Sequence, residues 1–212
     1  MARRTRQALK SDAEQLAALY VQARNVLVRA GRTLHDLVGS SLSAAGVQLQ
    51  LLRMDVPSAE ARIDETLRTL DDALNRVREL SHDLCPSPAY RGGLKQALLR
   101  LADQNGSKGC QVIVDYSATA AAPAEIAAAL HEGCGSAVER AIQMGATRVR
   151  ITARGSAGLT LRIADNGRKS GRARALAATR TLARAQGLAF ECTTGKSTIV
   201  CIRYAVRRTP RG

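Results

Sequence analysis

The sequence predicts an α+β protein in which a helical hairpin, paired with a second copy in a four-helix bundle, precedes an α/β sandwich. Apolar residues recur in steps of three and four over residues 16–84, with one break near residue 56. Beyond residue 88 the pattern changes to short alternating apolar stretches between Ala-rich stretches, which is typical of strands and helices packed together. Aromatic residues make up only 2% of the 212 residues, so the core must be built from Leu, Val, Ile and Ala.

The first half is expected to contain two long helices. Residues 1–10 are basic and are expected to be loose, and the first apolar stripe then runs from Leu16 to Leu52. Asp55-Val56-Pro57-Ser58 breaks this stripe, and Ser58 is a candidate N-cap for the next helix. The second stripe runs from Ile63 to Leu84, where Cys85-Pro86-Ser87-Pro88 ends it.

One hairpin cannot bury both stripes well, whereas two copies can bury them in a bundle. We therefore expect a homodimer. The alternative is that the stripes pack on the second domain of the same chain. The domain boundaries that follow are residues 11–88 for the dimerisation hairpin and residues 91–206 for the second domain.

The second half is expected to place helices on one face of a mixed sheet. A short helix is expected over residues 94–102, a long one from Pro123 to about Met144, and a basic one over residues 172–186 that Gly187 ends. Five strands are expected. Apolar residues alternate over residues 147–153 and 159–163, residues 112–114 are a consecutive apolar run, and the last two strands are expected at residues 188–193 and 198–205.

The formal charge of +14 is unevenly placed along the chain. Residues 1–90 hold 12 Lys and Arg against 11 Asp and Glu, whereas residues 91–212 hold 20 against 7. A basic half attracts nucleic acid, anionic lipid, nucleotides or acidic proteins, and charge alone does not choose among them. Single-stranded nucleic-acid sites usually add stacking aromatics, which are scarce here, so no nucleic acid is expected as a partner.

The five cysteines form neither a CxxC pair nor a metal-ligand spacing, so no metal site is assigned. An odd count at wide intervals favours reduced thiols in a cytoplasmic protein. No segment of the sequence approaches the length of a membrane span.

Two motifs in order give the chain a resemblance to the cytoplasmic core of bacterial sensor histidine kinases. Residues 33–42 read Thr-Leu-His-Asp-Leu-Val-Gly-Ser-Ser-Leu, which is similar to the family's phosphoacceptor motif ELHDxVGxxL. The ending of the family's second helix, LxxxLxPxxLxxxGLxxAL, is matched over residues 80–98, with Gly93-Leu94 as its Gly-Leu pair. The resemblance covers nearly the whole chain and implies that the second domain is a histidine-kinase-type ATPase domain.

The resemblance implies that His35 is the phosphoacceptor and that Asp36 is its acid/base partner. Attack on a phosphoryl group needs an unprotonated ring nitrogen, which an adjacent carboxylate can orient. The phosphoryl group would then pass to an aspartate on a response-regulator receiver domain. Ser40 stands where the family often has the Gln or His that positions water for dephosphorylation.

The nucleotide motifs of the family are only partly kept. Glu132 is retained, Ser136 replaces the asparagine that holds Mg²⁺, and Asp165-Asn166-Gly167 matches the DNG motif whose aspartate binds adenine. The resemblance therefore implies Glu132, Ser136, Asp165 and Gly167 as nucleotide-binding candidates, with ATP and Mg²⁺ as the ligands.

The rest of the ATP site departs from the family. Ala175-Leu176-Ala177-Ala178-Thr179 stands where the family has Gly-Leu-x-Gly-Met, and residues 194–198 resemble its GGTT box only in outline. Alanine adds a methyl group where glycine lets backbone amides approach phosphates. Lys169, Arg172 and Lys196 remain available to attract phosphates electrostatically.

Three functions follow as hypotheses. The first is a phosphotransfer protein that receives a phosphoryl group on His35 from an upstream donor protein and passes it to a response regulator. The second is an active ATP-dependent histidine kinase. The third is a basic module that binds nucleic acid or a membrane surface. The terminal arginine clusters at residues 3–6 and 207–211 suggest this hypothesis. His82 is expected to be a cap or surface residue, and His131 a structural one.

Overall fold

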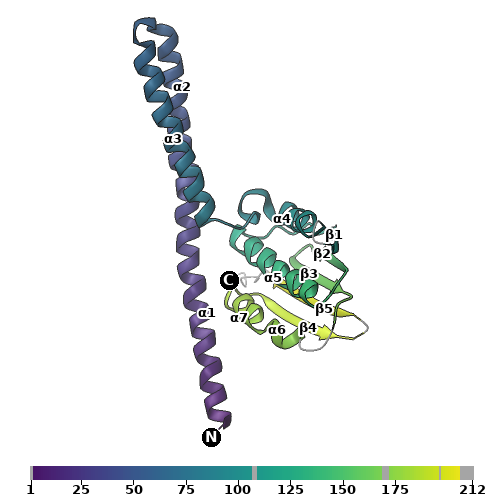
Figure 1. Ribbon diagram of the computed structural model, residues 1–212. Helices are drawn as coiled ribbons and strands as arrows, with labels where there is room; N and C mark the ends of the chain where they lie inside the picture. The colour runs from purple at the N-terminus through teal and green to yellow at the C-terminus, as the bar shows by residue number, and fades with distance from the viewer. Residues whose placement is uncertain (1, 107–108, 169–171, 196, 206–212) are drawn as a thin grey trace, which may run out of the picture. The chain divides into compact units, whose positions relative to one another are not determined.

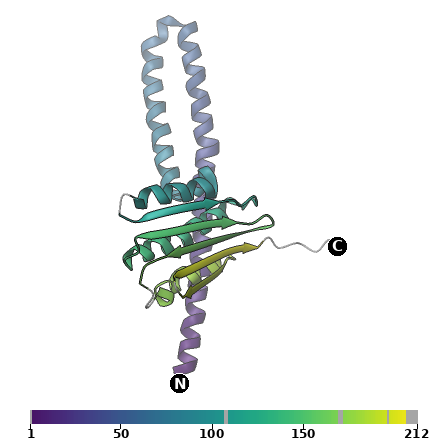
Figure 2. The same cartoon turned by 90° about the vertical axis from the view of Figure 1, so that its right-hand side faces the viewer.

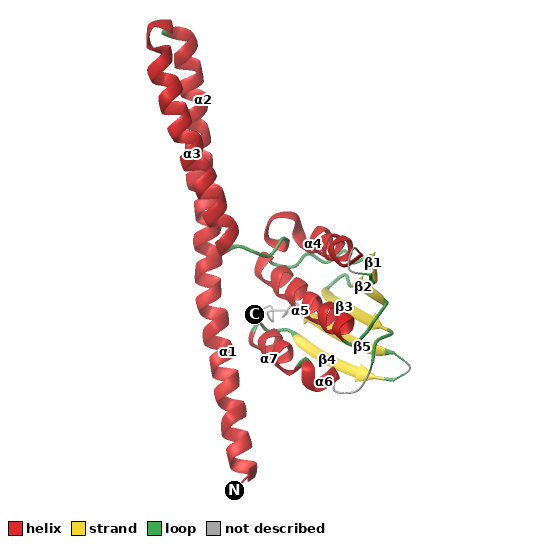
Figure 3. Cartoon of the chain, in the orientation of Figure 1, coloured by secondary structure: helices red, strands yellow, loops and turns green. Residues whose placement is uncertain are grey.

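The computed structural model describes residues 2–106, 109–168, 172–195 and 197–205 (Figure 1). The chain divides into two compact units, one being Ala23–Pro86 and the other combining Met1–Gln22 with Ser87–Gly212. The first unit is helical, and the second contains the sheet, drawn in yellow in Figure 3. The expected fold class, a helical hairpin followed by an α/β sandwich, is confirmed.

The hairpin consists of two antiparallel helical segments. Helix α1 (Ala2–Thr33) continues through a short π-helix, η1 (Leu34–Val38), into α2 (Gly39–Asp55). A 3-10 turn, η2 (Pro57–Ala59), leads into α3 (Glu60–Leu84). The turn is closed by an ion pair in which Arg53 contacts Glu60 at 2.5 Å and Asp64 at 3.3 Å.

Apolar residues of α2 and α3 meet along the inner faces of the hairpin. Ile63 is buried, while Leu42, Leu49, Leu67, Leu70, Leu74 and Val77 are only half-buried. At the open end of the hairpin the helices come close together. A Cβ added to Gly31 there would lie only 2.7 Å from the Leu84 Cβ. The Cys85 thiol there donates to the Val28 carbonyl oxygen at 3.2 Å.

A large apolar surface of the hairpin stays exposed. Its large exposed apolar residues are Val26, Leu27, Leu37, Val38, Val47, Leu51, Leu52, Met54 and Leu80. Because several of these recur at steps of three and four along one helix, they form a stripe rather than isolated residues.

The second unit is a five-stranded sheet with the order β1-β2-β3-β5-β4. Strands β1 (Gln111–Tyr116) and β2 (Arg148–Arg154) are parallel. The remaining pairs, which add β3 (Gly158–Asp165), β5 (Thr198–Ala205) and β4 (Ala189–Thr194), are antiparallel. The sheet is therefore mixed, as the sequence predicts.

Helices cover one face of this sheet (Figure 1). They are α4 (Ala89–Gly106), α5 (Ala124–Gln143) and α7 (Ala177–Ala185), with the short α6 (Arg172–Ala175) beside them. Inward side chains alternate along the strands and meet the helices in one core, which includes Leu98, Leu130, Val138, Ile151, Leu161, Ile163 and Ile202.

None of the described helices covers the other face of the sheet, which Figure 2 turns toward the viewer. Exposed arginines alternate with the buried positions on it: Arg148, Arg150, Arg154, Arg162 and Arg203. Arg154 contacts Asp115 at 2.8 Å, and Arg203 contacts Glu191. Much of the basic charge of the second half therefore lies on one polar sheet face.

Three local expectations are wrong. Residues 2–10 are helical rather than loose, because Ala, Arg, Gln, Leu and Lys there all favour helix. Ser58 lies inside the 3-10 turn, and the residue that precedes α3 is Ala59, which makes no side-chain cap bond. The helix expected over residues 172–186 is broken at Leu176, although Gly187 ends it as predicted with φ +79°.

Candidate functional site

The helix that carries His35 is locally widened. In η1 the Gly39 backbone N–H donates to the Leu34 carbonyl oxygen, five residues back, instead of the usual four. Such single π-turns hold one extra residue in the helix and occur frequently at functional sites. The turn leaves both His35 and Asp36 exposed, so the imidazole is open to an incoming molecule.

His35 borders a hollow of about 400 Å³ between the two arms of the hairpin. The first arm contributes His35, Gly39, Ser40 and Ser43, and α3 contributes Leu74, Val77 and Arg78. The hollow is large enough for a phosphate group and lies within the Ala23–Pro86 unit.

Both serines of the hollow bond to the backbone of their own helix. The Ser40 hydroxyl donates to the Asp36 carbonyl oxygen at 2.5 Å, and the Ser43 hydroxyl donates to the Gly39 carbonyl oxygen at 2.9 Å. The Asp36 carbonyl lies in η1 and the Gly39 carbonyl lies in the first residue of α2, so both hydroxyls are bonded to the helix backbone close to His35.

The Asp165-Asn166-Gly167 turn lies at the end of β3 and is held rigidly. Asp165 is buried, and its Oδ1 accepts a hydrogen bond from the Gly167 backbone N–H at 2.9 Å. The Asn166 Oδ1 accepts from the backbone N–H groups of Thr147 and Arg148, both at 3.0 Å. Asn166 therefore ties the turn to the start of β2, while Asp165 faces the core.

Thr198 is a functional candidate that the sequence reasoning missed. It pairs with Asp165 across β3 and β5, is fully buried, and its Oγ1 has no hydrogen-bond partner among the residues that the structure describes. Buried hydroxyls are normally bonded, so an orphaned one beside a buried carboxylate indicates a place for a polar ligand or a water. The sequence signal was present, because Thr198 ends the segment that resembles the GGTT box in outline.

Cys110 borders the same carboxylate. Burial, and secondarily the charge of Asp165, raise the pKa of the Cys110 thiol. The thiol therefore stays protonated at neutral pH and serves as a packing group.

Glu132 and Ser136 lie one turn apart on α5, and both are half-buried. Helix α5 is unbroken over Ala124–Gln143, although it contains Gly133 and Gly135. A Cβ on Gly133 would lie 2.9 Å from Ile202 Cδ1, so glycine here lets α5 approach β5 closely. Cys134 is fully buried, and burial raises the pKa of its thiol to about 12.

The two other histidines lie apart from η1 in the sequence. His131 is half-buried on α5, with its Nδ1 3.4 Å from the Ser87 hydroxyl. Burial lowers the pKa of His131. His82 is exposed near the end of α3, 3.9 Å from the neighbouring Asp83 carboxylate.

The phosphate-attracting cations Lys169 and Lys196 lie outside the described residues, and so does the side chain of Arg172. Both terminal arginine clusters also fall where side chains are not described. The alanines that replace the lid glycines, Ala175 and Ala178, lie in α6 and α7.

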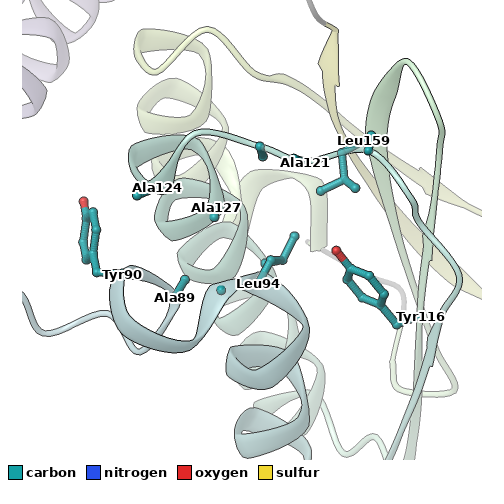
Figure 4. A pocket seen from close by; sticks show the side chains of 11 residues that line it. Ala89, Tyr90, Leu94, Tyr116, Ala121, Ala124, Ala127 and Leu159 are labelled. Atoms are coloured by element: carbon teal, nitrogen blue, oxygen red, sulfur yellow. The ribbon is translucent and has the colours of Figure 1, made fainter.

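A second hollow, of about 350 Å³, opens between α4 and α5 (Figure 4). It is lined mainly by small apolar residues, with Leu94, Tyr116 and Leu159 around it. Leu159 and Asp165 lie near opposite ends of β3, about 20 Å apart at 3.3 Å per residue. This hollow is therefore separate from the Asp165 turn.

Among the described residues, no three His, Cys, Asp or Glu side chains gather in a way that could hold a metal ion. All five cysteines are free. None of the described helices has both the length and the apolar character that a bilayer crossing requires.

Comparison with known proteins gives one family match and several structural ones. Residues 27–89 match HisKA_3, a family described as histidine kinase. No curated protein matches the chain.

The solved structures that are similar to the chain include histidine kinases. The Erythrobacter litoralis EL346 blue-light activated histidine kinase is 17% identical with a TM-score of 0.41, over 77% of this chain and 59% of that chain. Its separate histidine kinase domain is 16% identical with a TM-score of 0.42, over 87% of this chain and 94% of that one. The Acinetobacter baumannii histidine kinase AdeS is 11% identical with a TM-score of 0.42, over 77% and 96%. The segment that holds η1, His35 and Asp36 thus matches the histidine kinase family, and the match ends at residue 89.

Proposed function

We propose that this chain is a cytoplasmic two-component signalling protein that carries a phosphoryl group on His35 and transfers it to an aspartate of a response-regulator receiver domain. The observation that carries the proposal is the exposed imidazole on a π-turn, beside a hollow large enough for a phosphoryl group, inside the segment that matches the histidine kinase family.

The chemistry at His35 is a simple displacement. The unprotonated ring nitrogen attacks phosphorus, an N–P bond forms, and the bond from phosphorus to the donor's leaving atom breaks with its electron pair. Asp36, the next residue on the same turn, orients the imidazole and takes up its ring proton. In the second half-reaction the receiver aspartate attacks the phosphorus and the N–P electron pair returns to the imidazole. By the same displacement, an upstream donor protein would transfer its phosphoryl group to His35.

The hairpin is proposed to act as a homodimer. Its exposed apolar stripe includes Leu37 (65% exposed), Val47 (56%) and Leu51 (50%), which a second hairpin would cover. A four-helix bundle of this kind leaves the hollow beside His35 open to a docking receiver domain.

A second candidate function, ATP-dependent phosphorylation of His35, is favoured by Thr198. Its orphaned hydroxyl next to the buried Asp165 carboxylate fits the polar edge of an adenine ring, directly or through water. When bound, ATP would supply the phosphoryl group. Asp165, Gly167 and Thr198 would hold its base, while Glu132 and Ser136 would offer oxygens to Mg²⁺.

The test uses two donors on the same purified protein. Potassium phosphoramidate, a small donor, should place an acid-labile and base-stable phosphoryl group on the wild-type chain and on His82→Gln, but not on His35→Gln. The labelled protein should pass this group to at least one member of a panel of purified receiver domains.

Mg-ATP distinguishes the two candidate functions. Labelling of His35 by ATP supports the kinase, whereas labelling by phosphoramidate alone supports the phosphotransfer protein. If His35→Gln is labelled as fully as the wild type by every donor, the proposal is wrong.

A further inference from the structure

We infer that Arg78 on α3 is the phosphoryl-binding residue of this site, holding the oxygens of the group carried by His35 from across the hairpin. The inference rests on the proposed function and adds to it a specific anion-binding group. It begins from the position of Arg78, which lines the same hollow as His35 but comes from the opposite arm.

Among the described residues that line this hollow, Arg78 is the one with a permanent positive charge, and none of them carries a carboxylate. Its only described bond is a long one, in which Nη1 donates to the Asn75 Oδ1 at 3.4 Å. An arginine has five N–H donors, so most of its donors remain available for an anion in the hollow. No acidic residue among those described forms an ion pair with it.

The other polar groups of the hollow are poor anion donors. The hydroxyl hydrogens of Ser40 and Ser43 are already directed to the carbonyl oxygens of Asp36 and Gly39. Their lone pairs therefore face outward, and a phosphoryl group would meet acceptors there. Only Arg78 offers donors together with positive charge.

The floor of the hollow strengthens this interaction. Leu74 and Val77 are half-buried and apolar, and they lie on the same helix as Arg78. Apolar walls exclude water from one side of the site, which partly offsets the solvent screening of the exposed His35 and Arg78 side chains. A guanidinium can bind two phosphoryl oxygens at once, which orients the group as well as attracting it.

The test again uses phosphoramidate, so that it does not depend on any nucleotide site. The N–P bond to His35 forms while the P–N bond of phosphoramidate breaks, and the ring proton leaves on ammonia as ammonium. The rate of labelling is compared for wild type, Arg78→Gln, Arg78→Lys and Arg76→Gln. Arg76 is exposed on α3, about 200° around the helix from Arg78, and provides the same change of charge.

We expect Arg78→Gln to label His35 at least about tenfold more slowly, because the variant loses the charge-assisted hydrogen bonds to the phosphoryl oxygens. The labelling rate of Arg78→Lys should be intermediate, because lysine keeps the positive charge but loses the paired N–H donors with which a guanidinium binds two oxygens. Arg76→Gln should match the wild type. Circular dichroism melts of all four proteins check that the hairpin is intact.

Phosphorus NMR adds a readout that a purely structural role would not change. A neighbouring guanidinium favours the dianion, so the pKa of the phosphoryl group on His35 should rise in Arg78→Gln and stay unchanged in Arg76→Gln. If wild-type His35 is labelled but Arg78→Gln matches it in both rate and phosphorus titration, this inference is wrong while the proposed function stands. If the wild type takes no label, the proposed function itself fails.

Discussion

At the scale of single residues, Thr198 is unusual because its buried hydroxyl has no hydrogen-bond partner among the described residues, whereas native structures nearly always provide one. Valine has the same shape without the hydroxyl. The cost of burying an unbonded polar group is about 1–3 kcal/mol, so Thr198→Val should raise the free energy of unfolding by about 1 kcal/mol. If the hydroxyl serves a ligand, the same variant should lose nucleotide affinity.

The two effects are measured separately, by urea unfolding and by calorimetric titration with ADP. Thr193→Val, on the same sheet but exposed in β4, is the control and should change neither. A variant that is less stable than the wild type would mean that the hydroxyl is bonded after all.

His131 makes stability depend on pH in a definite direction. Burial lowers its pKa in the folded state, so below the ordinary value near 6.5 the unfolded chain binds the proton more readily than the folded one. The contribution of neutral His131 to the free energy of unfolding is fully present above that pH. It is lost as the pH falls through the pKa that His131 has in the folded state. His131→Gln should therefore unfold with a smaller loss of melting temperature between pH 7.5 and 5 than the wild type. His82→Gln, which changes an exposed histidine, should follow the wild type over the same range.

At the scale of elements, close approach at the open end of the hairpin depends on glycine. A Cβ on Gly31 would lie 2.7 Å from the Leu84 Cβ and 2.9 Å from the Cys85 Sγ, so the two chain segments must separate to admit it. Gly31→Ala should reduce the free energy of unfolding by about 1–3 kcal/mol, the usual cost of overpacking.

Gly46 provides the contrast on the same hairpin. Its Cβ would lie 3.3 Å from the Leu70 Cδ2, the mobile end of a half-buried side chain. Alanine is preferred over glycine in a helix by about 1 kcal/mol, so Gly46→Ala should be neutral or stabilising. Thermal and urea unfolding of both variants give the comparison, and equal destabilisation would contradict it.

The elements also show how far local sequence patterns reach. The helices of the hairpin and all five strands follow from apolar periodicity, because spacing along one chain segment already defines which face is buried. The break at Leu176 and the π-turn over Leu34–Val38 do not follow. Both change the backbone within a segment whose residues are ordinary helix formers, so propensity and periodicity carry no sign of them.

At the scale of the whole molecule, the exposed apolar stripe predicts association of two chains. Leu37→Lys with Leu51→Lys would place two charges in the proposed interface, where they cannot be solvated, and should give a monomer. Light scattering coupled to size-exclusion chromatography at micromolar concentration measures the mass. Thr69→Lys, exposed on α3, is the control and should leave the dimer intact. A wild-type monomer under these conditions would contradict the bundle.

The basic charge has a different expected consequence. The exposed arginines of the uncovered sheet face, three of them being Arg148, Arg150 and Arg162, have no aromatic residue on that face to stack with a base. Any binding to a 20-base single-stranded DNA should therefore be electrostatic and should disappear as salt is raised, as fluorescence anisotropy would show. Binding that falls steeply as salt is raised would support the nucleic-acid hypothesis, and the slope would report the number of phosphates neutralised. An absence of binding even at low salt would contradict that hypothesis.

The sequence by itself determined the two-part organisation, the paired helices, the mixed sheet with its helical layer, and the candidates His35, Asp36, Glu132, Ser136, Asp165 and Gly167. These follow from periodicity and from motifs, which are properties of neighbouring residues. Only the tertiary structure decided that Arg78 shares a hollow with His35 and that Thr198 lies beside Asp165. Each of those pairs joins residues more than 30 positions apart, and the pairing of helices and strands, which no local pattern encodes, brings them together.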